Sequence, residues 1–146
     1  MSILEALVEK KIIAQEDVAS ILDESESENV SVEQVLVKRG IDPEIILKTK
    51  SEFLDVPTRE LKNKEIPGKI LEFIPEESAS HYRFVPIGVR DGVLEVGIVD
   101  PDNIEARDAL NFISAKINMP FKIFLISEQD FDSVISMYKG LSGQVT

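Results

Sequence analysis

The sequence contains no cysteine and no tryptophan, and it has one histidine among 146 residues. Without cysteine the chain can form no disulfide framework, redox dithiol or thiolate metal site. A serine-based active site would need a base, an orienting acid and an oxyanion hole, and the neighbours of His81 are not arranged in these roles. Asp100 and Asp102 do not continue into a calcium-binding loop. We therefore expect no catalytic, cofactor-binding or metal-binding residue in this segment.

Long hydrophobic runs and phosphate-binding loops are also absent. No apolar stretch approaches the roughly 18 residues of a membrane span, and no signal-peptide pattern opens the chain. The seven glycines form neither G-x-x-x-x-G-K-[ST] nor G-x-G-x-x-G. These absences predict a soluble, cytoplasmic protein whose span carries no P-loop ATP hydrolysis.

The charge is strongly acidic. The chain has 27 acidic and 16 basic side chains, a net charge of −11. The lysines and arginines are not clustered, which argues against nucleic-acid binding. Residues 1–60 carry 14 acidic and 7 basic side chains, a net −7. This excess either steers a basic partner toward the N-terminal part or serves solubility alone.

The most informative pattern that is present is a repeated phrase near the start of the chain. Residues 6–13, ALVEKKII, are echoed by residues 35–41, VLVKRGI, with an offset of 29 between Leu7 and Leu36. An acidic run with helical periodicity follows each copy. The repeat indicates one helix–turn–helix unit used twice, because a single helix pair cannot bury its own apolar stripe.

The first copy predicts two helices and a polar segment. The first helix has an apolar stripe at i, i+3 and i+4, formed by Leu4, Leu7 and Val8. A second helix is expected from about residue 16 to residue 22. Residues 23–29 are polar and acidic, and we interpret them as a solvated loop or a frayed helix end.

The second copy has clearer helix boundaries. Ser31 with Gln34 forms a capping box that begins a third helix, and Gly40 suits the left-handed residue after that helix ends. Asp42 followed by Pro43 is typical of an N-cap and first turn, which predicts a fourth helix as far as Phe53.

Residues 56–126 change from helical periodicity to alternation. A connector is expected over 56–65, and Pro67 and Pro75 each open a short helix. Apolar residues then alternate on both sides of Asp91-Gly92, which predicts a β-hairpin with a type I′ turn. A helix should follow, capped by Asp102 with Glu105 and with an apolar face made of Ala106, Ala109, Leu110, Ile113 and Ile117.

A third strand over residues 121–126 and a final helix capped by Ser127 complete the order β-β-α-β-α. We predict an α+β (or α/β) fold in two lobes. The helical lobe spans 1–60, a small sheet covered by helices spans 61–140, and 141–146 is a tail or a linker toward a motor domain.

Six ordered segments resemble a known family. They are residues 51–57 (SEFLDVP), 73–77 (FIPEE), 82–87 (YRFVPI), 91–96 (DGVLEV), 100–106 (DPDNIEA) and 110–112 (LNF). In this order and spacing they are similar to the N-terminal domain of the bacterial type II secretion and type IV pilus assembly ATPases (the GspE/PilB family, MshEN-like). The resemblance covers essentially the whole chain.

The resemblance implies a non-catalytic docking or regulatory domain. In that family the domain precedes a hexameric ATPase motor and docks on the cytoplasmic part of an inner-membrane platform protein, so the chain would be peripheral to that membrane through its partner. A motor domain of the same chain, where present, would be a second partner. A free-standing adaptor of the same fold and a small enzyme using Ser80 and His81 are alternatives.

Some members of the family bind cyclic di-GMP through a doubled motif, R-L-G-x-x-L-V-x-x-G-L-L. Aligned with this chain, Ser2 and Leu4 take the Arg and Gly places of the first R-L-G, and Ser31 and Glu33 take those of the second. Both arginines are therefore missing, and Glu33 would bring an anion to the bound phosphates. Since arginine's planar fork is hard to replace, the alignment argues against cyclic di-GMP binding.

The apolar frame of the motif survives although its polar ligands do not. The later glycine of the motif is Lys11 in the first copy and Gly40 in the second. We interpret the repeat as architecture that shapes a lobe and offers a docking face. If the first helix docks a partner, the contacts are Leu4, Leu7, Val8 and Ile12. The other role open to these four is the lobe's own core.

Overall fold

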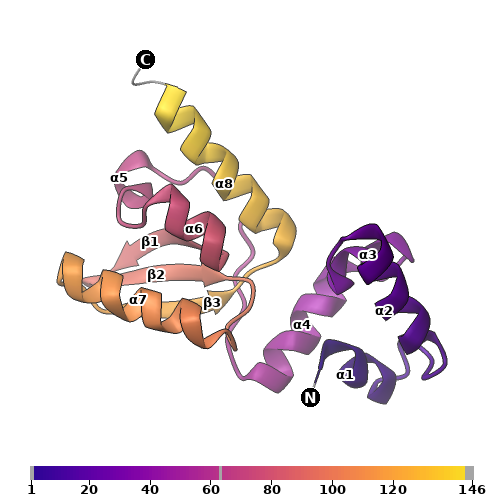
Figure 1. Ribbon diagram of the computed structural model, residues 1–146. Helices are drawn as coiled ribbons and strands as arrows, with labels where there is room; N and C mark the ends of the chain where they lie inside the picture. The colour runs from indigo at the N-terminus through magenta and orange to yellow at the C-terminus, as the bar shows by residue number, and fades with distance from the viewer. Residues whose placement is uncertain (1, 63, 144–146) are drawn as a thin grey trace. The chain divides into compact units, whose positions relative to one another are not determined.

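The computed structural model describes residues 2–62 and 64–143 (Figure 1). These residues form eight helices and one three-stranded sheet, which confirms the predicted α+β class. The chain divides into two compact units, the first ending at Asp55 and the second beginning at Val56.

Unit 1 contains α1 (Ile3–Glu9), α2 (Asp17–Glu28), α3 (Val32–Lys38) and α4 (Pro43–Leu54). The repeat is visible in their bounds, because α3 begins and ends 29 residues after α1, and α4 begins and ends 26 residues after α2. The connection inside the second pair is therefore three residues shorter. The apolar stripes of the helices meet in one core made of Leu4, Leu7, Ile21, Val35, Leu36 and Ile46.

The acidic segment of unit 1 is helical rather than a loop. α2 continues through Glu28 and ends at Asn29, which takes the left-handed conformation with φ 54°. Of the two interpretations of residues 23–29, the solvated loop is wrong and residues 23–28 form the end of a helix. Two of the acidic side chains there, Glu24 and Glu28, pair with Arg39 and Lys38 at the end of α3. Glu24 accepts from Arg39 at 2.9 Å, and this hydrogen bond holds the pKa of the Glu24 carboxyl below its usual value.

Unit 2 contains α5 (Gly68–Leu71), α6 (Glu76–Tyr82), β1 (Phe84–Arg90), β2 (Val93–Ile98), α7 (Ile104–Ile117), β3 (Phe121–Leu125) and α8 (Glu128–Gly143). The sheet order is β1-β2-β3, with β1 antiparallel and β3 parallel to β2. The hairpin prediction is confirmed, since Asp91 and Gly92 both have positive φ, 53° and 75°, as a type I′ turn requires. α7 makes the crossover between the parallel strands that Figure 1 shows beside it.

The two faces of the sheet differ in polarity. Leu94, Val96 and Ile98 of β2 share one face and are buried in the core of unit 2. On the other face Arg59 donates to Glu95 at 3.1 Å, and its guanidinium lies 4.1 Å from the centre of the Phe124 ring. The hydrogen bond from Arg59 lowers the pKa of the Glu95 carboxyl.

The first residues of unit 2 extend the sheet beyond β3. The amide of Leu125 donates to the carbonyl of Pro57 at 2.7 Å, and the amide of Arg59 donates to the carbonyl of Leu125 at 3.0 Å. Thr58 thereby forms a parallel bridge with Leu125. Because of this pairing, the division after Asp55 falls earlier than the lobe boundary predicted at residue 60.

Two helix ends also differ from the sequence prediction. Asn103, not Asp102, caps α7, because its side-chain oxygen accepts from the amides of Glu105 at 3.0 Å and Ala106 at 3.3 Å. α8 continues through Gly143 and so includes the first part of the predicted tail. Residues 144–146 of that tail lie outside the described residues. Ser127 caps α8 as predicted, accepting from the amide of Asp130 at 3.1 Å.

Candidate functional site

The four residues predicted to dock a partner lie on or just after α1, and burial divides them. Leu4 and Leu7 are 4% and 0% exposed and belong to the core of unit 1. Val8 and Ile12 are half-buried. A partner could reach Leu7 only by opening unit 1, so Leu4 and Leu7 take the core role that the sequence left open. Docking through Val8 and Ile12 stays a prediction.

The positions of the nucleotide-binding motif make contacts within unit 1. The Ser2 hydroxyl accepts from the amide of Glu5 at 3.2 Å, and the Ser31 hydroxyl accepts from the amide of Gln34 at 3.0 Å. These two serines cap α1 and α3, where the motif would place arginine. Glu33 forms an ion pair with Lys50 of α4. The side chains at these positions hold helix ends and helix pairs together.

The residue at the later glycine of the motif has a left-handed backbone conformation in both copies. Lys11 has φ 62° and Gly40 has φ 98°, both in the left-handed region. After each, the next amide closes the same bond, from Ile12 to the carbonyl of Leu7 and from Ile41 to that of Leu36, both at 3.0 Å. The backbone of the repeat is therefore the same in both copies, although neither copy has the arginine of the family motif.

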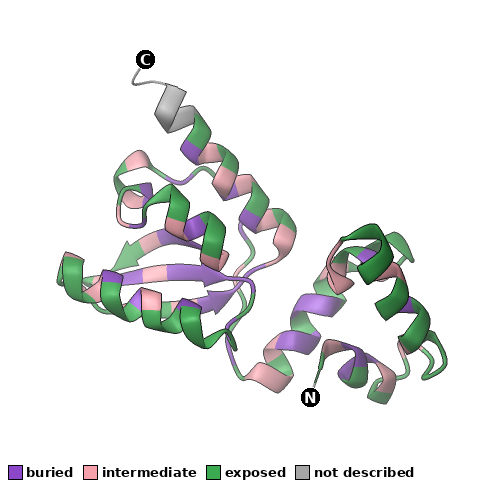
Figure 2. Cartoon of the chain, viewed as in Figure 1, coloured by how far each residue is buried: buried purple, intermediate pink, exposed green. Residues whose placement is uncertain are grey.

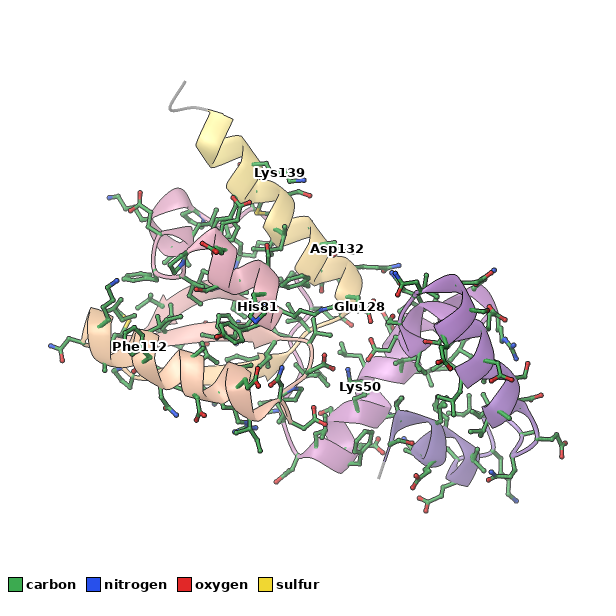
Figure 3. All side chains as sticks on the ribbon, viewed as in Figure 1. Lys50, His81, Phe112, Glu128, Asp132 and Lys139 are labelled. Atoms are coloured by element: carbon green, nitrogen blue, oxygen red, sulfur yellow. The ribbon has the colours of Figure 1, made fainter. Side chains whose placement is uncertain are left out.

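The single histidine shows no catalytic arrangement. His81 is exposed near the end of α6, with its ring edge-on to Tyr82 at 4.7 Å between centroids (Figure 3). Within residues 2–62 and 64–143, no three His, Asp or Glu side chains gather as metal ligands would. The expectation that this segment needs no cofactor stays a prediction.

Among the described residues, one hollow lies between α6 and α7. It has a volume of about 480 Å³ and an open mouth. Ser78 and Tyr82, one helical turn apart, line it from α6. Apolar atoms of Ala109, Phe112 and Ile113 line it from α7. We call this hollow the α6–α7 groove.

The charged side chains that line the α6–α7 groove are both acidic. The remaining residues that line it are Glu105 and Asp108, both exposed on α7. Together with Phe112 they stand at i, i+3 and i+7, which places all three on one side of the helix. No lysine or arginine is among the residues that line the groove. The groove therefore combines an apolar surface with two carboxylates.

Sequence reasoning did not single out this groove. In the sequence Phe112 is notable only as part of a family-like segment, yet its side chain is 71% exposed, and Ile104 on the same helix is 74% exposed. Figure 2 shows the exposed side of α7 opposite its buried stripe. The available signal was that these two large apolar residues lie off the stripe that faces the core.

The MshEN domain family model matches residues 54–145. In sequence the chain is 28% identical over 111 residues to the type IV pilus assembly ATPase PilB of Myxococcus xanthus (strain DK1622). That alignment covers 75% of this chain and 20% of PilB, so the chain spans about a fifth of the length of this curated relative.

Solved structures show the same fold at low sequence identity. A structure of MshE with cdg superposes with a TM-score of 0.71 at 19% identity, covering 94% of this chain and 99% of that one. The N-terminal domain of XpsE superposes with a TM-score of 0.64 at 20% identity, covering 92% and 91%. Across the described ranges, no helix is both long and apolar enough to cross a bilayer.

Proposed function

The chain belongs to the MshEN domain family of N-terminal domains from secretion and pilus ATPases, and from this membership we propose a docking and regulatory role. The domain would hold an ATPase motor to the cytoplasmic part of an inner-membrane platform protein and would itself catalyse nothing. The observation that carries the proposal is the family match over residues 54–145, joined to a fold likeness over 94% of the chain.

The residues of unit 1 support mechanical coupling over nucleotide sensing. A dinucleotide needs guanidinium donors at its phosphates and bases. Ser2 and Ser31 stand at the two arginine places and cap helices, and Glu33 adds a carboxylate that pairs with Lys50. A repeat in this state can transmit force through two packed helix pairs without a ligand.

Calorimetry with the partner tests the docking role. The purified chain is titrated with the cytoplasmic domain of the platform protein from the same machine. We expect saturable binding with a dissociation constant near 1 μM, about −8 kcal/mol. Absence of binding by a chain whose circular dichroism and melting curve are those of a folded protein would contradict the proposal.

Cyclic di-GMP sensing is the second candidate, because MshE has been solved with cdg and shares this fold. We expect no heat of binding when cyclic di-GMP is titrated to 100 μM into the chain. The matched comparison is a relative that keeps both arginines of the motif, titrated under the same conditions. Micromolar or tighter binding by this chain would overturn the argument from Ser2, Ser31 and Glu33.

A further inference from the structure

Phe112 of α7 is a large apolar side chain that is mostly exposed to solvent. A phenyl ring that is 71% exposed leaves apolar surface in water, although its helix also offers a buried side. Scattered apolar residues on a surface are normal. Phe112 differs because it borders the α6–α7 groove, in which Tyr82 faces it from another helix and Ala109 and Ile113 extend the apolar lining.

The charges at the groove restrict the chemistry of what can cover it. Glu105 and Asp108 repel anions, so a phosphate-rich nucleic acid and an anionic membrane surface are both disfavoured. The neighbouring cation Arg107 is not among the residues that line the groove, and its Nε donates to the carbonyl of Pro101. Lysine or arginine on a protein partner would complement the two carboxylates and could also lie over the Phe112 ring.

The dimensions favour a short helix as the occupant. Glu105 and Phe112 are seven positions apart on α7, about 10 Å along the axis at 1.5 Å per residue. This length matches two turns of a helix, enough for apolar side chains at i and i+4 with cations beside them. The groove has one wall from α6 and one from α7, and an amphipathic helix can pack into a groove between two helices.

We propose that the α6–α7 groove binds a basic amphipathic helix of a partner protein. Its apolar side chains pack against Phe112 and Tyr82, and its lysines or arginines pair with Glu105 and Asp108. The inference deepens the proposed docking function, on which it rests, by naming the surface and the chemistry of the partner. The small area makes this contact one part of a larger or transient interface.

Site-directed photo-crosslinking in the full-length protein, expressed in its own cells, tests the surface. The change is Phe112→p-benzoylphenylalanine, and the matched control is the same substitution at Val89 of β1, a second exposed apolar residue of unit 2. We expect position 112, but not position 89, to crosslink to a protein segment with lysine or arginine at helical spacing. Crosslinks to lipid, to an acidic segment or to nothing would overturn the proposal.

A titration with the crosslinked segment, made as a synthetic peptide, tests the charges. Glu105→Lys with Asp108→Lys should weaken binding at least tenfold, and Phe112→Ser should do the same. The control, Asp132→Lys on the exposed side of α8 (Figure 3), should bind like the unmodified chain. Equal affinity for all variants would contradict the proposed pairing.

The two proposals fail in different ways. If position 112 crosslinks to a basic helix of a protein other than the platform component, the groove is confirmed and the docking partner is wrong. If the platform domain binds with an affinity that Glu105→Lys with Asp108→Lys leaves unchanged, docking stands and the α6–α7 groove is not its surface.

Discussion

At the scale of single residues, the most instructive position is Lys11. It lies just after the end of α1 and has φ 62°, a left-handed conformation that costs a residue with a Cβ about 1 kcal/mol. Its counterpart in the second copy is Gly40, which takes φ 98° without that cost. The same left-handed backbone position is therefore occupied by different residues in the two copies, and only glycine takes it without strain.

This difference predicts opposite effects of exchanging the residue types. Lys11→Gly should raise the free energy of unfolding by about 0.5 kcal/mol, since relief of strain exceeds the added entropy of the unfolded chain. Gly40→Ala should lower it by about 1 kcal/mol, although an added Cβ would meet no atom within 4 Å. Urea denaturation measures both. A lower midpoint for Lys11→Gly would show that its side chain contributes more than its backbone costs.

Glu95 supplies a pH-dependent prediction at the same scale. Its pKa is lowered in the folded state, so the ion pair with Arg59 stabilises the fold above the unfolded pKa of about 4.3 and is lost as pH falls through the folded pKa. Glu95→Gln should therefore cost about 0.5–1 kcal/mol at pH 7 and nothing at about pH 2. Denaturation at both pH values measures this, with Glu60→Gln in an exposed pair as control. A cost that persists at low pH would contradict it.

At the scale of elements, the sequence predicted most helices and the hairpin, because their signals lie within a few residues of each other. The Ser31–Gln34 capping box and the Asp91-Gly92 turn are of this kind, and both are confirmed. The loop interpretation of the acidic half of α2 was wrong, and part of the reason is that Glu24 and Glu28 pair with Arg39 and Lys38 at the end of α3. Local charge repulsion was visible in the sequence, whereas the compensating pairs depend on packing.

The N-terminus of α7 gives a direct test at this scale. Asn103→Ala should cost about 1 kcal/mol, because two amides of the first turn lose their acceptor. Asp102→Ala, at the cap position predicted from the sequence, should change the free energy of unfolding by less than about 0.5 kcal/mol. Thermal denaturation compares them. The reverse order of effects would restore Asp102 as the cap.

At the scale of the whole molecule, each unit has its own apolar core. One core gathers the four helices of unit 1, and the other gathers the sheet and helices of unit 2. The candidate site illustrates what the sequence could not provide at this scale. The exposed side of Phe112 follows from helical spacing, but the groove requires α6, about thirty residues earlier, to lie beside α7.

Separate cores predict separate responses to a core mutation. Leu36 is 0% exposed in unit 1, and Leu36→Ala should cost about 2–5 kcal/mol there. Hydrogen exchange should show faster exchange for amides of α1 to α4 and unchanged protection for the sheet. Leu110→Ala, buried in unit 2, is the matched change and should give the converse pattern. Loss of protection in both units from either variant would mean that they unfold as one.

The bridge between Thr58 and Leu125 has a consequence for the order in which the chain folds during synthesis. The ribosome completes unit 1 at Asp55, and its helix contacts can form as soon as that stretch has emerged. Thr58 is synthesised soon afterwards, but Leu125, the residue with which it pairs, follows 67 residues later. At 5–20 residues per second, about three to thirteen seconds pass before they can pair. During that interval residues 56–59 follow the folded unit 1 without a strand partner. The edge of the sheet is completed only when β3, the last strand to be synthesised, pairs with this earlier segment.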